Sequence, residues 1–275
     1  MSVAVTAVYQ EKLRYVNRLL VDLESAVVAY SGGVDSTLLL RLCRDALGDG
    51  VLAVTAHSPT YPADELTPAV EVAKSLSVRH RVIETAELDD PRFVANPTDR
   101  CYHCKLELFG RLRGIAEAEG LKNVVDGSNC DDLNDSRPGS RAAAELGVRH
   151  PLQEAGLTKQ EIRTLSRELG LGNWSKPSLA CLASRVPYDT PITRQALAAI
   201  DGTESYLRGL GIGQVRVRHH GDTARVEVEP GEMAVLLDES NREGILSRFK
   251  ELGYLRVTVD LAGYRCGSMN EGLTK

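Results

Sequence analysis

The sequence predicts an α/β protein, in which an N-terminal parallel-sheet domain precedes a smaller C-terminal α+β domain. Two observations support this prediction. Between residues 26 and 126, short apolar segments alternate with segments of helical periodicity, which is typical of a parallel sheet covered by helices on both faces. From Pro191 onward, helices mix with neighbouring alternating strands, which indicates an α+β unit. We therefore expect domains over 1–175 and 191–275, joined by a loop over 176–190.

Composition argues against several classes of function. The chain has 275 residues, of which 43% are hydrophobic and only 5% aromatic, so its core must consist mainly of Leu, Val and Ala. A net charge of −5 argues against a long nucleic-acid interface, which needs a basic surface. No apolar run reaches membrane-spanning length and the N-terminus lacks a signal-peptide pattern, so we expect a cytoplasmic protein without a membrane partner. In that compartment, six cysteines favour metal or redox chemistry over disulfides.

The first elements are a helix, a strand and a second helix. Residues 4–24 carry apolar side chains at helical spacing, which predicts an amphipathic helix. The Val-rich segment 26–30 is too short for a helix and predicts a buried strand. Leu38, Leu39 and Leu42 share one helical face and therefore predict a second helix. A glycine-rich segment connects the strand to this helix.

That glycine-rich segment is Ser31-Gly32-Gly33-Val34-Asp35-Ser36. Its glycines let the backbone approach an anion, and the following helix start presents N–H groups and a positive dipole end. No Lys follows the second glycine, so the segment is not a Walker loop. It resembles the PP-loop (S-G-G-x-D-S) of the ATP pyrophosphatases, which have the adenine nucleotide alpha hydrolase-like fold. The resemblance implies that ATP is bound and cleaved between its α and β phosphates, whereas the alternative is a turn whose glycines serve packing alone.

The next elements continue the alternation. A strand over 51–56 ends at His57-Ser58-Pro59, where related enzymes place the base and ribose of the nucleotide, so Ala56 and Ser58 are candidate ATP contacts. The alternative is an ordinary strand-ending turn with Pro. The expected elements that follow are a helix over 63–77, a strand over 79–84, a helix over 103–119 and a strand over 123–126.

The last of these strands leads into the segment 127–133, which begins Gly127-Ser128-Asn129. PP-loop enzymes carry a similar G-T-N-x-D-D segment opposite the phosphate loop, so Gly127, Asn129 and Asp132 are candidate nucleotide contacts. Acidic side chains suit Mg²⁺, a hard cation that takes oxygen ligands, and Asp35 would share the metal or orient the pyrophosphate leaving group. The alternative for Asp131 and Asp132 is a helix cap and a first-turn dipole pair.

The cysteines indicate the chemistry that follows nucleotide binding. Cys101 and Cys104 form a C-x-x-C at the start of a helix, where the dipole and the neighbouring Arg100 and Lys105 favour thiolates. Zinc, iron–sulfur and dithiol redox sites all use this spacing. A second C-x-x-C is absent, so single cysteines would complete a metal site: Cys43, Cys130, Cys181 or Cys266.

Cys181 stands out among the single cysteines. Pro177 and Pro187 bracket its segment, so the segment is a constrained loop and not one regular helix. A thiol beside the hydroxyl of Ser184 and the guanidinium of Arg185 is typical of a site, and a buried loop cysteine is the alternative.

Four motifs together resemble the LarE family of ATP-dependent sulfurtransferases: R-C-Y-x-C-K at 100–105, P-S-x-A-C-L-A-S-R-x-P-Y at 177–188, V-R-V-R-H-H-G-D at 215–222 and G-Y-R-x-G-S-M-N at 263–270. This family makes the pyridinium-3,5-bisthiocarboxylic acid mononucleotide ligand of the nickel-pincer cofactor of lactate racemase. The resemblance implies a substrate derived from nicotinate mononucleotide, a sulfide donor as partner, and a homo-oligomer, in the family a hexamer.

The resemblance also implies a mechanism. ATP and the substrate carboxylate form an acyl-adenylate, and sulfur then displaces AMP to leave a thiocarboxylate. Some members sacrifice the sulfur of the loop cysteine, whereas others bind a [4Fe–4S] cluster through three cysteines. This sequence matches the second type through Cys101, Cys104 and Cys181, and three thiolates leave one iron open. Cys181, Asp35 and Arg185 are then the candidate catalytic residues.

The C-terminal half is expected to recognise the substrate. Thr158 and Glu161 form a capping-box pattern that starts a helix through 169. Arg216 and Arg218 alternate with valines along a strand, so both guanidiniums lie on one face and suit a phosphate or carboxylate. Ser184 and Arg185 are further candidate substrate contacts, and the alternative for the two strand arginines is a solvated face paired with Glu227 or Glu229. The expected C-terminal elements are a helix to 209, strands over 213–219 and 223–229, helices between 231 and 252, and a strand over 254–260.

Three other functions compete with sulfur transfer to a mononucleotide. A PP-loop tRNA thiolase would need a basic RNA-binding surface, which the acidic total disfavours. A PP-loop amidotransferase or synthetase that uses ammonia would not need three reactive thiols. A cluster-carrying or zinc-stabilised binding module would use ATP only as a regulator, and the release of AMP distinguishes an enzyme from such a module.

Overall fold

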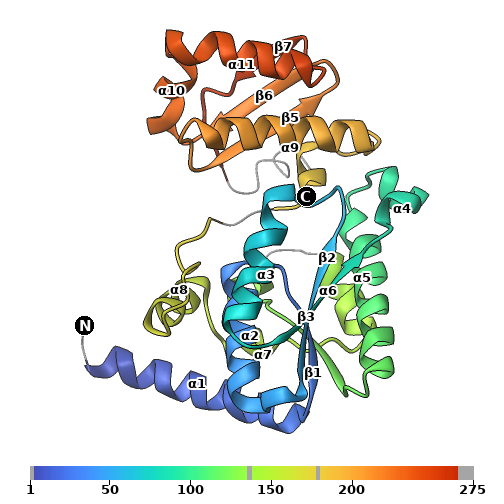
Figure 1. Ribbon diagram of the computed structural model, residues 1–275, viewed down its shortest axis with the longest axis vertical. Coiled ribbons are helices and arrows are strands. Elements are labelled where there is room, and N and C mark those ends of the chain that lie inside the picture. The colour runs from blue at the N-terminus through green and yellow to red at the C-terminus, as the bar shows by residue number, and fades with distance from the viewer. Residues whose placement is uncertain (1–2, 135–137, 178–179, 266–275) are drawn as a thin grey trace. The chain divides into compact units, whose positions relative to one another are not determined.

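The computed structural model describes residues 3–134, 138–177 and 180–265 (Figure 1). Parts of the motifs at 177–188 and 263–270, including Ser178 and Cys266, therefore lie outside the described residues. The chain forms two compact units. The first comprises Met1–Ser58, Glu65–Glu87 and Asp99–Ser178, and the second comprises Pro59–Asp64, Leu88–Thr98 and Leu179–Lys275. In the part of the chain that the structure describes, no helix combines the length and the apolar character needed to cross a bilayer.

The first unit contains the predicted parallel sheet. Its strands are β1 (Ala26–Ala29), β2 (Val51–His57), β3 (Arg79–Glu84) and β4 (Asn123–Asp126), in the order β3-β2-β1-β4. All neighbouring strands pair in parallel, so their carboxyl ends lie at one edge. The α/β prediction is confirmed.

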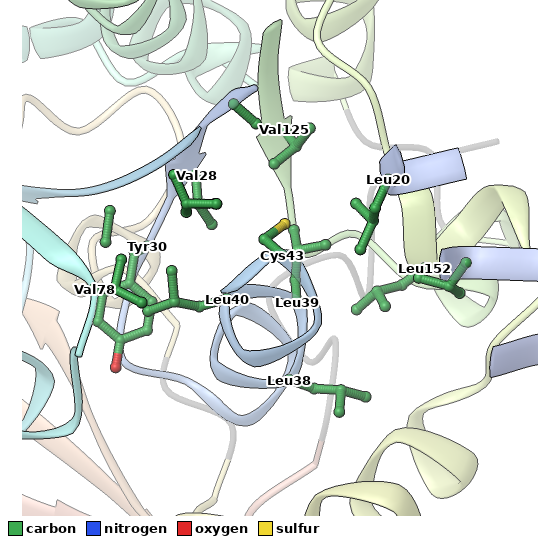
Figure 2. Packing of buried hydrophobic residues seen from close by; sticks show 14 of the residues in the cluster. Leu20, Val28, Tyr30, Leu38, Leu39, Leu40, Cys43, Val78, Val125 and Leu152 are labelled. Atoms are coloured by element: carbon green, nitrogen blue, oxygen red, sulfur yellow. The ribbon is translucent and has the colours of Figure 1, made fainter. Parts of the chain in front are cut away.

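Helices cover both faces of this sheet, so the strands β1, β2 and β4 are largely buried, whereas the edge strand β3 is mostly exposed. Successive residues of β1 point to opposite faces: Val28 packs in one apolar cluster with α2, and Val27 packs in another with α5. Figure 2 shows the first cluster, in which Cys43 of α2 is fully buried among leucines and valines. The helices of this unit are α1 (Val3–Leu23), α2 (Val34–Leu47), α3 (Leu66–Ser75), α5 (Arg100–Ala118), α6 (Pro138–Glu145), α7 (Pro151–Glu154) and α8 (Lys159–Glu168).

Local sequence signals located most of these helices. The capping box of α8 is confirmed: Thr158 Oγ1 accepts from the Glu161 amide at 3.3 Å, and Glu161 Oε2 accepts from the Thr158 amide at 2.8 Å. Helix α5 begins at Arg100, earlier than predicted, so both cysteines of the C-x-x-C lie in its first turns. The short helices α6 and α7 have no predicted counterpart, because they carry too few turns for a clear hydrophobic period.

The second unit has the predicted α+β character, and it includes two segments from the N-terminal half of the chain, 59–64 and 88–98. Its elements are α4 (Pro91–Val94), α9 (Arg194–Gly209), β5 (Val215–His220), β6 (Thr223–Val228), α10 (Met233–Leu237), α11 (Glu239–Glu251) and β7 (Arg256–Val259). Strands β5 and β6 form an antiparallel pair, whereas β7 pairs with β6 in parallel. The parallel pair arises because α10 and α11 carry the chain back before β7 begins. Val217, Val226 and Phe249 lie in the core of this unit.

Candidate active site

The PP-loop connects β1 to α2 in the geometry of an anion cradle. Gly32 adopts a φ of +72°, and a Cβ there would lie 2.7 Å from the Cβ of Ala69 on α3, so only glycine fits. The hydroxyls of Ser31 and Ser36 lie 3.1 Å apart. Among the described residues, no side chain caps the start of α2 at Gly33 by a hydrogen bond, so the first N–H groups of this helix can bind an anion.

A second glycine brings the end of β4 onto this loop. A Cβ at Gly127 would lie 2.8 Å from the amide nitrogen of Ser36, which is closer than real Cβ atoms approach. Because β4 pairs directly with β1, the segments after both strands meet at the carboxyl edge of the sheet, where open α/β sheets bind ligands. The candidate contacts Ala56, near the end of β2, and Ser58, directly after it, belong to the same edge.

Asp35 of the PP-loop is bonded to a residue that sequence reasoning missed. Lys159 Nζ, at the start of α8, donates to Asp35 Oδ2, and the Lys159 amide donates to Asp131 Oδ2 at 2.9 Å. Lys159 therefore links the phosphate loop to the acidic segment after β4. Asp35 Oδ1 is buried, and no described residue hydrogen-bonds it. The available signal for Lys159 was the capping box, which places it at the first position of a helix.

The acidic segment after β4 is held by its own side chains. The Asn129 amide donates to Asp132 Oδ2 at 2.9 Å, and the Asp131 amide donates to Asn129 Oδ1 at 2.9 Å. Gln153 of α7 donates to the Asn129 carbonyl at 3.2 Å. Asp131 and Asp132 thus bond backbone amides, as in the capping alternative, and these contacts fix the local backbone of the segment after β4.

Two further residues at this edge carried no sequence signal. Asn173 Nδ2 donates to the Gly32 carbonyl at 3.0 Å and to Thr37 Oγ1 at 2.8 Å, so a distant loop fixes the backbone of the PP-loop. Ser58 is buried and its hydroxyl donates to the buried carboxylate of Glu87. Neither Asn173 nor Glu87 lies in a recognisable motif, and each acts on a residue far away in the chain.

The C-x-x-C occupies the first turns of α5 in the first unit. Cys101 is exposed and Cys104 is half-buried. Residues three apart on a helix share a face, so both thiols lie on the same face of α5. A Cβ at Gly139 would lie 3.0 Å from Cγ of Lys105, which shows that the start of α6 packs against this turn. No described cysteine forms a disulfide, and within the described residues no group of three or more His, Cys, Asp or Glu side chains is arranged to hold a metal ion.

The Cys181 loop belongs to the second unit and is held by a buried arginine. Arg185 is fully buried, and its Nε and Nη2 donate to both carboxylate oxygens of Glu204 at 2.8 and 2.9 Å. Its Nη1 donates to the carbonyls of Ala180 and Cys181 at 2.8 and 3.1 Å. Glu204 also accepts from the Val217 amide at 2.9 Å. Arg185 therefore fixes the backbone at Cys181 and anchors it to α9 and β5.

Arg216 and Arg218 lie next to this loop, but in the protein interior. Arg218 donates to both oxygens of Glu227 at 3.0 and 2.7 Å and to the Ser184 carbonyl at 2.9 Å. The pairing with Glu227 agrees with the alternative from the sequence, except that this strand face is buried and not solvated. The Arg216 guanidinium lies 5.2 Å from the ring centroid of Tyr264, and burial together with the nearby positive charge of Arg185 lowers the pKa of Arg216 to about 10.

The buried pair of Arg185 and Glu204 allows a stability prediction. Arg185→Met is expected to lower the free energy of unfolding by about 3–5 kcal/mol, because it leaves a buried carboxylate without its bidentate partner. The double variant Arg185→Met/Glu204→Leu should lose less than the sum of the single losses. Urea unfolding measures each value, and Arg256→Met, which breaks an exposed pair with Asp222, is the control with an expected loss below about 1 kcal/mol. Additive losses in the double variant would contradict the prediction.

Comparison with known proteins covers nearly the whole chain. Residues 9–98 match the family model described as NAD synthase. An uncharacterized protein of Synechocystis is 42% identical over 266 residues, which are 97% of this chain and 99% of that protein. The pyridinium-3,5-bisthiocarboxylic acid mononucleotide synthase of Lactiplantibacillus plantarum is 40% identical over 258 residues, 92% of each chain. An uncharacterized protein of Methanocaldococcus jannaschii is 30% identical over 87% of this chain and 90% of its own length.

Proposed function

The chain belongs to the LarE family, and on that premise we propose that it transfers sulfur to the carboxylates of pyridinium-3,5-biscarboxylic acid mononucleotide at the expense of ATP. The PP-loop carries this proposal. Its position at the carboxyl edge of a parallel sheet, with Gly127 pressed against Ser36, leaves a cradle in which backbone N–H groups meet a bound anion without an intervening side chain.

In the first step, the substrate carboxylate attacks the α-phosphorus of ATP, the bond to pyrophosphate breaks, and an acyl-adenylate forms. We assign the phosphates to the PP-loop, residues 31–36, and the base and ribose to Ala56 and Ser58. We also assign Gly127, Asn129 and Asp132 as nucleotide contacts, on the side opposite the PP-loop. No proton is transferred in this step, so the chain contributes orientation and charge. Lys159, already bonded to Asp35, provides a cation for the departing pyrophosphate.

Asp35 fits the role of a Mg²⁺ ligand. Its Oδ1 atom is buried without a hydrogen bond from a described residue, which is a cost that a hard cation would remove. Bound there, Mg²⁺ would offset the negative charge of the pyrophosphate leaving group. Asp132 lies on the neighbouring segment, and we place it near the same metal.

In the second step, sulfur attacks the acyl carbon and AMP departs. We propose that Cys101, Cys104 and Cys181 hold a [4Fe–4S] cluster, and thiolates three residues apart on one helix face suit such a ligand set. With three protein ligands, the cluster would present one iron for sulfide from an external donor. Arg185 holds the carbonyl of Cys181 and so keeps this ligand in place.

We assign substrate recognition to the cluster of Ser184, Arg185, Arg216 and Arg218. Arg216 supplies positive charge for the nucleotide phosphate or a carboxylate, because its guanidinium stacks on an aromatic ring and stays charged at neutral pH. Arg185 and Arg218 serve to position their neighbours in this cluster, since each already forms an ion pair with a glutamate.

The proposal is tested by product analysis. With ATP, sulfide and the biscarboxylic mononucleotide, we expect equal release of AMP and pyrophosphate and a product in which sulfur replaces carboxylate oxygen, identified by mass spectrometry. Release of pyrophosphate with tRNA, and not with the mononucleotide, would favour a tRNA thiolase. Binding of ATP without any AMP release would favour a binding module.

A further inference from the structure

The carboxyl edge of the first sheet continues beyond β4. Val125 forms a parallel bridge with Arg149, and the Asp126 amide donates to the Arg149 carbonyl at 3.1 Å. The edge therefore runs from Ser58 after β2, through the PP-loop after β1, to Asp126 and then to His150. If the base and ribose lie at the β2 side and the phosphates lie between the PP-loop and the segment that starts at Gly127, the edge beyond them, at Asp126 and His150, remains for the acyl group and its nucleophile.

Asp126 and His150 form a close pair on that side. His150 Nδ1 lies 2.6 Å from Asp126 Oδ1, and the same oxygen accepts from the Ser128 amide at 3.0 Å. An ionised carboxylate only accepts hydrogen bonds, so Nδ1 carries the proton and Nε2 holds the lone pair of the neutral ring. No described residue hydrogen-bonds Nε2, and the side chain is 20% exposed. The orientation matches that of a base held by a carboxylate.

The charges around the imidazole favour proton uptake. Burial by itself lowers the pKa of His150, but the hydrogen bond and the charge of Asp126 outweigh it, so the pKa lies above its ordinary value. Glu154 of α7 adds to this rise, and Lys105 of α5 opposes it. For Asp126, burial raises the pKa. The hydrogen bond from His150 and the charge of Lys105 lower the pKa by more than burial raises it, so the net pKa lies below the ordinary value. The carboxylate thus stays ionised, and the imidazole takes up a proton more readily than a free histidine side chain.

We propose that His150, oriented by Asp126, accepts the proton that sulfur releases when the thiocarboxylate forms. This inference rests on the proposed function. Hydrosulfide attacks the acyl carbon, the carbon–sulfur bond forms, and the bond from that carbon to the AMP oxygen breaks with its electron pair leaving on AMP. The S–H proton passes to His150 Nε2, which gives the thiocarboxylate anion and an imidazolium.

A structural role for the same pair makes a different prediction. If the pair only held the segment after β4 against the PP-loop, its loss would weaken ATP binding and adenylation as well as sulfur transfer. His150→Asn separates the two roles. Its side-chain amide nitrogen takes the place of Nδ1 and still donates to Asp126, but no group replaces the acceptor Nε2. Asp126→Asn keeps the shape and an oxygen acceptor for Nδ1–H and the Ser128 amide, but it removes the negative charge that stabilises the imidazolium, so proton uptake at Nε2 is weakened.

The test measures pyrophosphate release and thiocarboxylate formation in the same reaction, with ATP, the mononucleotide and sodium sulfide. In His150→Asn and Asp126→Asn, we expect pyrophosphate release to persist and thiocarboxylate formed per pyrophosphate to fall about 10²-fold or more. The ratio of wild-type to variant sulfur transfer should rise with pH as His150 deprotonates, and taking the ratio cancels the titration of sulfide itself. His80→Asn, which alters an imidazole bonded to Thr55 in the same unit, should leave the product ratio unchanged.

Two results would overturn the inference. If His150→Asn forms as much thiocarboxylate per pyrophosphate as the wild type, no proton passes to this residue. If both products fall together, the pair serves only to hold the segment after β4. Failure of the proposed function is distinguishable from both, because the wild-type protein would then release no pyrophosphate with this mononucleotide.

Discussion

Cys181→Ala is expected to eliminate both the iron–sulfur cluster and repeated turnover. The wild-type protein, purified without oxygen, should contain iron and acid-labile sulfide at about four each per chain, and removal of one of three ligands leaves too few thiolates to retain them. Cys101→Ala and Cys104→Ala should have the same effect. Iron and sulfide analysis, together with thiocarboxylate formed per chain in the presence of sulfide, provides the measurement.

Cys130→Ala is the matched control for these variants. Cys130 begins the turn after β4 and is not part of the proposed ligand set, so iron content and turnover should both persist. Unchanged iron and multiple turnover in Cys101→Ala would rule out the three-cysteine cluster. A wild-type protein that holds no iron even after reconstitution, turns over once and loses the mass of H₂S would instead assign Cys181 as a sacrificial sulfur donor.

Asp35→Asn should nearly abolish adenylation. The substitution removes the negative charge that Lys159 and the expected Mg²⁺ both contact, and it leaves the Lys159 amine beside a neutral amide. Loss of one preorganised electrostatic contact costs about 10²–10³-fold in rate, and we expect pyrophosphate release to fall by that amount. Pyrophosphate release at varied Mg²⁺ concentration measures the effect.

The control for Asp35→Asn lies on the same helix. Asp45→Asn removes an exposed ion pair with Arg41 near the end of α2, so it should leave adenylation unchanged and cost less than about 1 kcal/mol of stability. Lys159→Met is expected to lower pyrophosphate release with a smaller change in ATP affinity, because the amine acts on the leaving group. Wild-type Mg²⁺ dependence in Asp35→Asn would argue against Asp35 as a metal ligand.

Local signals in the sequence predicted the chemistry and most of the first unit. The strand before the PP-loop, the loop itself and the capping box at Thr158 depend on residues within a few positions of one another, and the structure contains each of them. The C-x-x-C at a helix start is equally local, although that helix begins three residues before the predicted start and ends one residue before the predicted end. Such features follow from backbone conformation and short-range hydrogen bonds.

Charged side chains at the site were predicted less well, because their roles depend on distant partners. The expectation for Arg218 rested on a strand period, which grouped it with Arg216. Pairing with Glu227 was only the alternative, and the period did not reveal that this strand face is buried. Arg185 was expected beside the substrate, and the structure describes it as a buried clamp on the Cys181 loop. Whether a charge meets solvent, a ligand or another charge depends on what packs around it.

The sequence by itself determined the fold class, the phosphate cradle and the supply of thiols, because these depend on glycines, periodicity and motif spacing. Only the tertiary structure decided which groups work together. Lys159 reaches Asp35 across 124 positions of the chain, and Asn173 reaches Gly32 across 141. The pairing of His150 with Asp126 likewise follows from strand order and not from spacing. Contacts of this kind form only when folding closes long loops, so no local pattern in the sequence encodes them.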